Sequence, residues 1–317
     1  MKLNKKPIIF LLGPTASGKT DWAINWQNQF EALEIISVDS VMVYKECNVG
    51  SAKPTDAILK KHPHHLVNHV SLDSIFSVAD FYDSALRLID DIHARDKIPL
   101  MVGGSMMYFS LLKKGISNLP SADLKLRDEL EQKILINGID ALHADLIKLD
   151  PEAGQNIDPH DSQRIIRAIE IIISTNMSLN ENLSSEKSSA LKEKYTLIEF
   201  GIFPQERSML HERIESRQEI LVGDKLLEEI VNIQNSFDIS AEHPAMKAIN
   251  YRQGLQVVEG KLEKSKLFEK SLFATRQFAK RQCTWMRGWE NLIYFDLHQG
   301  EEAAEQLKKQ FNLLEIV

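Results

Sequence analysis

Residues 8–20 read IIFLLGPTASGKT, an apolar run followed by a glycine-containing octet. Residues 13–20 satisfy the pattern G-x-x-x-x-G-K-[S/T] in full, between an expected strand and an expected helix that begins near Asp21. Glycines let the backbone wrap around an anion, and the amino terminus of the following helix adds partial positive charge. We therefore expect a phosphate-binding loop in which Lys19 reaches the terminal phosphate and the Thr20 hydroxyl binds Mg²⁺. The pattern leaves open whether the phosphates belong to a nucleotide or to another diphosphate.

The segments around this loop predict an α/β fold with a parallel sheet. Strands are expected at 8–12, 34–38, 98–102, 195–203 and 292–295, with helical patterns between most of them. In an open parallel sheet the carboxyl ends of the strands face the ligand, so Asp39 should lie beside the phosphate loop. Spacing alone leaves two roles open for Asp39: catalysis, or service as a cap or magnesium ligand.

A second strand end carries Gly103-Gly104-Ser105. Two glycines permit close approach of the backbone to a ligand, and Ser105 offers a hydroxyl at the same edge of the sheet. A tight strand-to-helix turn is the simpler explanation of the glycines taken alone.

Residues 45–65 are expected to form a loop, and residues 66–70 are a possible strand. The loop holds His62, His64 and His65, which invite a metal assignment. Without cysteines or a spaced carboxylate, a polar loop is the favoured interpretation.

The alternation of strands and helices stops between residues 119 and 194. Helical patterns at 123–137, 140–149 and 162–174 are followed by a polar, serine-rich stretch at 174–189 that we expect to be a flexible connection. We therefore predict a phosphate-loop core made of 1–118 and 195–317, whose C-terminal helices are basic, and a helical insertion domain at 119–194.

Charge is distributed unevenly along the chain. The formal net charge of −7 excludes a broadly basic surface, so a nucleic-acid partner would have to bind a local patch. Such a patch is expected at 245–287, where ten lysines and arginines stand against three glutamates, a net of +7. Aromatic residues in this segment suit stacked bases, although most of them are expected to lie in the core.

Other features narrow the class of protein. Cys47 and Cys283 have no partners at metal-ligand spacing, so the sequence indicates neither a disulfide framework nor a zinc site. The apolar run after Lys6 ends at Leu12, which is too short for a signal-peptide core or a membrane span. We expect a cytoplasmic protein.

Several of these segments together resemble the bacterial tRNA dimethylallyltransferases, which are also known as tRNA isopentenyltransferases or the IPP transferase family. The resemblance covers nearly the whole chain. It is carried by residues 13–20, Ser37-Val38-Asp39-Ser40, Gly50-Ser51-Ala52-Lys53-Pro54, Val102–Tyr108, Asp161–Arg164, Thr275–Gln282 and Trp285–Trp289. It implies a P-loop core with a helical insertion, and transfer of a dimethylallyl group from dimethylallyl diphosphate to the exocyclic amine of the adenosine 3′-adjacent to the anticodon.

The resemblance also implies roles for particular residues. Asp39 would be the general base, with Lys19, Thr15 and Ser105 as further catalytic residues, and Thr20 would bind the Mg²⁺ cofactor. The diphosphate would be held by Gly13, Pro14, Thr15, Ala16, Ser17, Gly18, Lys19, Thr20 and Arg217. The tRNA anticodon stem-loop would contact Asp39, Ser40, Val41, Met42, Ser105, Arg127, Gln163, Arg164, Ile165, Ile166, Arg167, Lys247, Ala248, Ile249, Asn250, Tyr251 and Arg252. No membrane partner is expected, and a monomer is a reasonable expectation.

The sequence departs from the family pattern at two positions. Ser105 stands where many members have threonine, which keeps the hydroxyl. Asn250 replaces the usual glycine before Tyr251 and Arg252, so the tRNA contacts of 247–252 are the least secure.

Three other classes of protein compete with this interpretation. A nucleotide kinase of the P-loop class would require ATP. An adenylate dimethylallyltransferase would take free nucleotides, which the insertion and the basic segment disfavour. A non-catalytic RNA-binding protein has no need of an intact phosphate loop beside Asp39.

Overall fold

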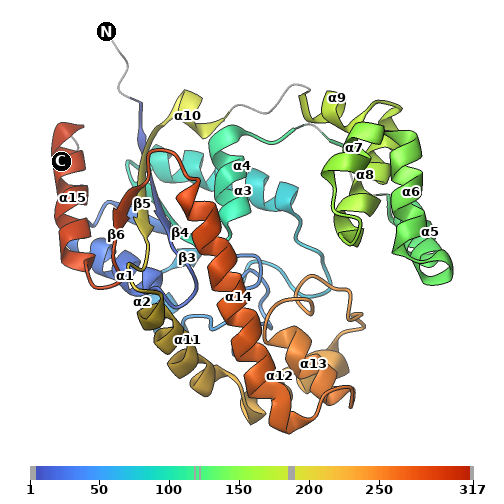
Figure 1. Cartoon of the computed structure of the whole chain (residues 1–317). Helices are drawn as coiled ribbons and strands as arrows, with labels where there is room; N and C mark the ends of the chain where they lie inside the picture. The colour runs from blue at the N-terminus through green and yellow to red at the C-terminus, as the bar shows by residue number, and fades with distance from the viewer. Residues whose placement is uncertain (1–4, 118, 121–122, 185–189, 315–317) are drawn as a thin grey trace. The chain divides into compact units, whose positions relative to one another are not determined.

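A computed structural model of the chain describes residues 5–117, 119–120, 123–184 and 190–314. The described residues fall into two compact units, one made of 1–113 and 191–317 and the other of 114–190. The boundaries expected from the sequence were 118/119 and 194/195. Both units are shown in Figure 1, and each is described here by itself.

The first unit is built on a parallel sheet with the strand order β3-β2-β4-β1-β5-β6 (Figure 1). Helices flank this sheet, so the predicted α/β class is confirmed. The strands are β1 (Pro7–Leu12), β2 (Leu33–Val38), β3 (His64–His65), β4 (Ile98–Gly103), β5 (Thr196–Ile202) and β6 (Ile293–Phe295). The helices are α1 (Lys19–Gln29), α2 (Asp56–Lys61), α3 (Val78–Ala94), α4 (Met106–Lys114), α10 (Leu191–Lys194), α11 (Arg207–Leu221), α12 (Asp224–Ser236), α13 (Tyr251–Val258), α14 (Leu267–Arg287) and α15 (Gly300–Leu313), with a short 3₁₀ turn, η1 (Lys264–Lys266), before α14.

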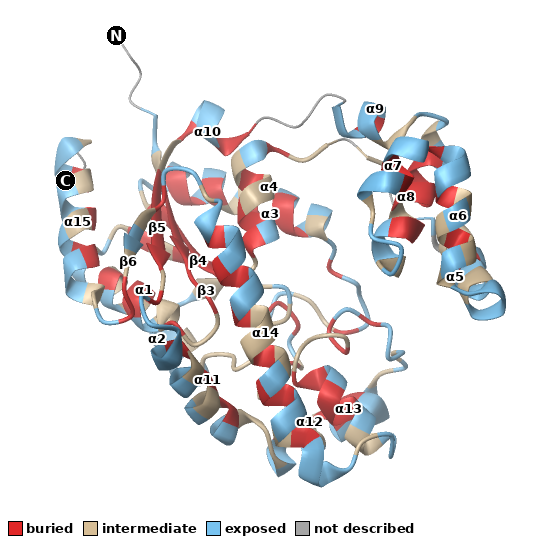
Figure 2. Ribbon diagram, in the orientation of Figure 1, coloured by how far each residue is buried: buried red, intermediate tan, exposed pale blue. Residues whose placement is uncertain are grey.

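The core of this unit lies between the sheet and its helices. Strand β1 is paired on both sides, and its residues 8–12 are fully buried. Red, the colour of buried residues, predominates in the sheet of Figure 2. The Trp26 ring of α1 packs edge-on against Phe200 of β5, with ring centroids 5.3 Å apart. Burial of rings of this size is among the largest favourable contributions to folding. The phosphate loop therefore follows a buried central strand of the sheet.

The second unit is helical. Its helices are α5 (Leu124–Asn137), α6 (Ile139–Leu149), α7 (Pro151–Asn156), α8 (Ser162–Thr175) and α9 (Leu179–Ser184). Apolar residues of α5, α6 and α8 form its core. The fully buried Glu170 carboxylate accepts hydrogen bonds from Arg127 (3.0 Å), Arg167 (2.7 Å) and the Asp123 amide (2.6 Å), so it links the start of α5 to α8.

Three local expectations were wrong. Residues 45–65 contain α2 and β3 and are therefore not all loop, and Leu66–Val70 is not a strand. The six-residue α2 is too short to show helical periodicity, and the Thr55 hydroxyl caps it by accepting from the Ile58 amide. The polar stretch after residue 174 contains α9, while residues 185–189 lie outside the described part of the chain.

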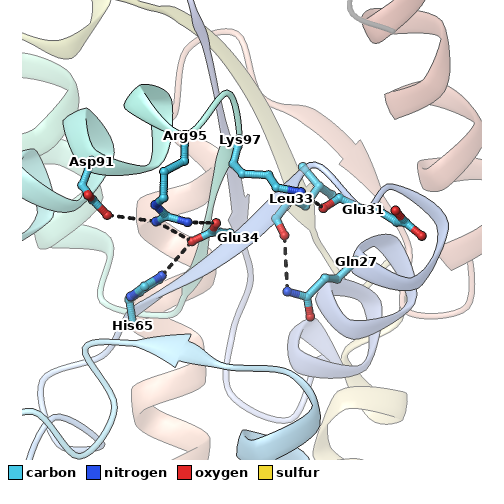
Figure 3. A network of polar contacts seen from close by, with 8 residues as sticks. All are labelled: Gln27, Glu31, Leu33, Glu34, His65, Asp91, Arg95 and Lys97. Carbon is cyan, nitrogen blue, oxygen red and sulfur yellow. Dashed lines mark hydrogen bonds and ion pairs between the residues drawn. The ribbon is translucent and has the colours of Figure 1, made fainter.

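The loop histidines are hydrogen-bonded to polar groups. The His62 ring contacts the Gln27 amide at 2.7 Å, and the His64 ring contacts the His62 carbonyl at 2.6 Å. Figure 3 shows His65 beside Glu34, which is also paired with Arg95 from the end of α3. No group of three His, Cys, Asp or Glu side chains in the described ranges is arranged to hold a metal ion.

The contacts of Glu34 lead to a prediction about stability. Burial raises the pKa of this carboxyl, but the Arg95 guanidinium and the His65 ring outweigh burial and hold the pKa below its ordinary value. The pKa of Glu34 is lower in the folded than in the unfolded protein. Its contribution to the free energy of unfolding is therefore complete above about pH 4.3, and it is lost as the pH falls through the pKa of the folded protein. Because Arg95 is exposed and solvent screens the pair, we expect Glu34→Gln to lower the free energy of unfolding by no more than about 1 kcal/mol at pH 7.

The measurement is urea unfolding at neutral and at acidic pH. Glu31→Gln is the matched control, because only the backbone carbonyl of Glu31 accepts a hydrogen bond, from Lys97 (Figure 3). Equal destabilisation by the two variants would contradict the prediction.

Candidate active site

Three neighbouring strands end side by side at the candidate site. The register pairs Leu12 of β1 and Val38 of β2 with Gly103 of β4, so the segments that follow these strands leave the sheet together. A Cβ atom on Gly103 would lie 2.1 Å from the Val38 carbonyl oxygen, so only glycine allows this approach. The phosphate loop, Asp39 and Ser105 therefore start from one edge of the sheet, as expected for a parallel sheet.

The phosphate loop has the backbone that an anion cradle requires. Gly18 has φ +90° and caps the start of α1, and Ala16 also has a positive φ of 63°. The Ser17 amide donates to the Pro14 carbonyl at 3.2 Å, and the Lys19 ammonium donates to the same carbonyl at 2.8 Å. The Ser17 hydroxyl is fully buried and has no hydrogen-bond partner among the residues that the structure describes. A buried hydroxyl without a partner is costly unless a ligand satisfies it, which supports anion binding in the loop.

Cations converge on this loop. Burial, together with the nearby charge of Arg217, lowers the pKa of Lys19 to about 7, although Asp39 acts in the opposite direction. Burial also lowers the pKa of Arg217, against the opposing effect of Asp39 and Asp21. Lys19, Arg217 and Asp39 are therefore within electrostatic reach of one another. An anion bound here would favour the charged form of Lys19.

A cavity of ≈ 670 Å³ opens over the loop. Its cationic wall is formed by Lys19 and by Arg213 and Arg217, which lie one turn apart on α11. Thr20 and Asp21 line it at the first turn of α1. Such a cavity has the size and charge to hold a small diphosphate.

The Asp39 carboxylate is held by the backbone that follows it. Its Oδ1 accepts hydrogen bonds from the amides of Val41 (2.8 Å) and Met42 (3.0 Å). These bonds fix the orientation of the carboxylate and leave Oδ2 for another partner. Asp39 also acts on the buried Tyr108, whose pKa is raised by burial first and by Asp39 second. A fixed, half-exposed carboxylate between the strand ends is suited to accept a proton.

The loop after Asp39 is anchored from α12 and α13. The Glu229 carboxylate accepts from the amides of Asn48, Val49 and Gly50 at 2.7–3.2 Å and from the Tyr251 hydroxyl at 2.6 Å. A Cβ atom on Gly50 would lie 2.6 Å from the Tyr251 ring. Tyr251, one of the expected tRNA contacts, thus has a fully buried side chain that packs beneath this loop.

Asn250 has a backbone conformation that explains the glycine usual at this position. Its φ is +73°, a region that asparagine tolerates better than most residues. The Asn250 side-chain amide donates to the Gly50 carbonyl at 3.0 Å, and its backbone amide donates to Gln253 at 2.9 Å. The Asn250 side chain therefore joins the turn before α13 to the anchored loop.

The other expected tRNA contacts are divided between the two units. Ser40, Val41, Met42 and Ser105 lie near the strand ends with Asp39, and the segment Lys247–Arg252 leads into α13. In the second unit Gln163 and Arg164 are exposed, whereas the Ile165 and Ile166 side chains are buried in its core. Arg127 and Arg167 are both paired with Glu170.

The basic segment is partly neutralised within the fold. Lys247, Lys261, Lys264, Lys266 and Arg276 form ion pairs with Glu242, Glu259, Asp224, Glu269 and Glu215, respectively. In the described part of the chain no ion pair is formed by Arg252, Lys270, Lys280, Arg281 or Arg287, all of which are exposed. Three of these cations, Lys280, Arg281 and Arg287, lie on α14 near the half-exposed Trp285.

Two residues at the site were not identified from the sequence. Arg213 of α11 donates to the Ser17 carbonyl at 3.3 Å, and its four-residue spacing from Arg217 could have indicated it. Gln282 of α14 donates to the Gly104 carbonyl and accepts from the Thr15 amide. A glutamine in the middle of a helix gives no local signal of such contacts.

Comparison with protein families matches residues 42–289 to the model of the IPP transferase family. The chain is 41% identical over 302 residues to a tRNA dimethylallyltransferase of Nitrosomonas eutropha, a match that covers 95% of this chain and 93% of the relative. It is 39% identical over 303 residues to the tRNA dimethylallyltransferase of Nitrosomonas europaea, covering 96% and 95% of the two chains.

Solved structures resemble this one over most of its length. The full-length tRNA isopentenylpyrophosphate transferase from Bacillus halodurans superposes with a TM-score of 0.70 at 30% identity, covering 98% of each chain. A eukaryotic dimethylallyltransferase acting on tRNA gives a TM-score of 0.78 at 23% identity, covering 97% of this chain and 79% of the other. At that identity the second likeness shows the fold alone.

Proposed function

The chain belongs to the IPP transferase family, and from that premise we propose which of its residues carry out prenyl transfer to tRNA. Its activity is that of a tRNA dimethylallyltransferase, which moves a dimethylallyl group to the exocyclic amine of the adenosine 3′-adjacent to the anticodon. The observation that supports our assignment of roles is that three neighbouring strands end side by side. The phosphate loop, Asp39 and Ser105 therefore all follow strands that end at the same edge of the sheet.

Dimethylallyl diphosphate is the donor, and its diphosphate binds in the phosphate loop. An allylic carbon shares positive charge, so the bond to diphosphate breaks readily if the growing negative charge is stabilised. Lys19, Arg217 and the loop amides are placed to supply that stabilisation, and the buried Ser17 hydroxyl adds a donor. Arg213, which sequence reasoning missed, lines the same cavity.

Thr20 would hold Mg²⁺ together with oxygens of the diphosphate. Thr20 lines the cavity in the first turn of α1, and its hydroxyl oxygen is the kind of hard ligand that Mg²⁺ prefers. Mg²⁺ is usually held by one or two protein ligands and the substrate's phosphates, so no larger cluster of acidic side chains is required. When bound, the ion would neutralise charge on the leaving diphosphate.

The acceptor amine loses its proton to Asp39. The amine of adenine is a poor nucleophile because its lone pair is delocalised into the ring, so removal of a proton as the bond forms lowers the barrier. The adenine must leave its stack in the anticodon loop to reach the Asp39 carboxylate, which lies between the strand ends. Thr15 and Ser105 carry hydroxyl groups just after the ends of β1 and β4, and we assign them to positioning the reactants.

The test is to incubate the protein with labelled dimethylallyl diphosphate, Mg²⁺ and unmodified tRNA, and then to digest the tRNA and identify the modified nucleoside. Label in dimethylallyl-adenosine from the anticodon loop, formed without ATP, is the expected result. A requirement for ATP would favour a kinase, and label in free adenylate would favour an adenylate dimethylallyltransferase. A tRNA that is bound but never modified would indicate a non-catalytic RNA-binding protein.

Exposed cations on α14 bind tRNA phosphates in this proposal. Because each phosphate contact releases counterions, we expect tRNA affinity to fall steeply with salt, and Lys280→Ala or Arg281→Ala to reduce the slope by about 1 each. Lys261→Ala is the control, because Lys261 is already paired with Glu259. The measurement is a filter-binding titration across salt concentrations. An unchanged slope in both α14 variants would exclude this face as a phosphate-binding surface.

We further propose that one chain is sufficient and that it acts in the cytoplasm, where its tRNA substrate is found. The residues assigned to donor binding and proton removal all come from one unit of a single chain, which supports a monomer. In the described part of the chain, no helix is both long enough and apolar enough to span a membrane.

A further inference from the structure

Gln282 connects the phosphate loop to the turn after β4. Its Oε1 accepts a hydrogen bond from the Thr15 amide at 2.9 Å, and its Nε2 donates to the Gly104 carbonyl at 2.8 Å. The side chain is almost completely buried, with 3% of its surface exposed. The oxygen and the nitrogen of the Gln282 side chain thus each form a hydrogen bond at a buried position. These two bonds join two loops that are far apart in the sequence.

The chain is shaped to accept this side chain. A Cβ atom on Gly104 would lie 2.4 Å from the Gln282 Nε2 and 3.3 Å from the Gly13 carbonyl oxygen. The lack of a side chain at Gly104 therefore lets the glutamine approach the backbone of the turn. On the other side, the bond to Gln282 directs the Thr15 amide toward α14.

We propose that Gln282 is a positioning residue that sets the separation between the diphosphate cradle and the acceptor side of the active site. This inference rests on the proposed function. Thr15 lies in the loop that holds the donor, and Gly104 directly precedes Ser105 on the acceptor side. A fixed separation matters because the amine must meet the allylic carbon as the diphosphate departs, and a misplacement of about 1 Å can cost 10²-fold in rate.

An amide is required because the two bonds need one acceptor and one donor at the same place. Methionine has a similar length but supplies neither group. An ionised glutamate can accept from the Thr15 amide but cannot donate to the Gly104 carbonyl, whereas a protonated glutamate can make both bonds. Protonation of glutamate at position 282 should therefore restore the hydrogen bond to the Gly104 carbonyl, which the ionised form cannot donate.

The first experiment compares Gln282→Met with the unmodified protein in the labelled-donor assay. We expect kcat to fall by about 10–100-fold while the KM for the donor changes less than about threefold, because the cradle itself remains. Thermal unfolding is measured alongside. A fall in melting temperature with kcat unchanged would show that Gln282 only stabilises the fold and would overturn the proposal.

The second experiment measures Gln282→Glu across pH. Burial raises the pKa of a carboxyl, so we expect the ratio of its kcat to that of the unmodified protein to rise at least about fivefold from about pH 8.5 to about pH 6. The ratio removes the pH dependence that both proteins share, including that of Lys19, whose pKa is about 7. A flat ratio would overturn the proposal, because a merely structural contact would not restore turnover on protonation.

A third variant tests the same contact from the other side. Gly104→Ala should displace the glutamine and lower kcat to a similar extent, and combining it with Gln282→Met should add little further loss. Fully multiplicative losses would mean that the two residues act independently. If the unmodified protein modified no tRNA, the proposed function would fail first, so the two failures are distinguishable.

Discussion

Asp39→Asn is expected to lower kcat by about 10²–10⁴-fold while tRNA binding is retained. Asparagine can still accept the hydrogen bonds that Val41 and Met42 donate to Oδ1, so the local backbone should be preserved. It cannot take a proton from the amine at neutral pH. Single-turnover kinetics with labelled donor, measured with tRNA in excess, would separate the loss in the chemical step from any loss in binding.

Asp83→Asn is the matched control for this change, because Asp83 is an exposed carboxylate on α3. We expect its kcat to stay within about twofold of the unmodified value, in line with a substitution at an exposed surface position. Turnover of the Asp39 variant at the unmodified rate would remove Asp39 from the reaction and leave it as a turn residue.

Lys19→Met is expected to lower kcat/KM for the donor by about 10²–10³-fold, the range seen when one donor to a developing negative charge is removed. Lys60→Met, an exposed lysine on α2, is its control and should leave kcat/KM nearly unchanged. The measurement is the initial rate over a range of donor concentrations. A Lys19 variant as active as its control would exclude the ammonium group from leaving-group stabilisation.

The pH dependence of donor binding provides an independent test of Lys19. Burial and the charge of Arg217 lower its pKa to about 7, so the ammonium loses its charge as the pH rises through that value. Since the diphosphate binds the charged form, its affinity should weaken above pH 7 in the unmodified protein. In Lys19→Arg the side chain stays charged throughout. Diphosphate affinity measured by calorimetry at several pH values should therefore fall less in Lys19→Arg than in the unmodified protein.

The placement of the phosphate loop and Asp39 at one edge of the sheet could be predicted from the sequence because it depends on local patterns. The phosphate-loop octet follows a strand and precedes a helix, and the acid ending the next expected strand must reach the same edge of a parallel sheet. The loop between Tyr44 and Pro54 was harder to predict, because its conformation depends on Glu229, some 180 residues away in the chain. The short helix α2 and the two-residue strand β3, which follow this loop, have too few residues for a periodic pattern.

Gln282 and the ion-paired residues of the basic segment also have contacts that local sequence patterns could not predict. Net charge indicated a cationic stretch, but the partners of Lys264 and Arg276 lie on other helices of the fold, α12 and α11. Which cations remain for tRNA could be determined only from the structure. For the glutamine, its neighbours Thr15 and Gly104 lie 267 and 178 residues away. No pattern along the chain encodes contacts of that range.

The placement of β1 affects how the protein is made on the ribosome. This strand is synthesised well before β5, which is one of its two neighbours and pairs Thr196 with Pro7. At ~5–20 residues per second, roughly 10–40 s pass before β5 has been translated. During that interval one edge of a strand made of Ile8, Ile9, Phe10, Leu11 and Leu12 has no partner. Nascent chains that have not yet reached β5 should therefore be substrates for ribosome-associated chaperones, and those that have passed it should be released from them.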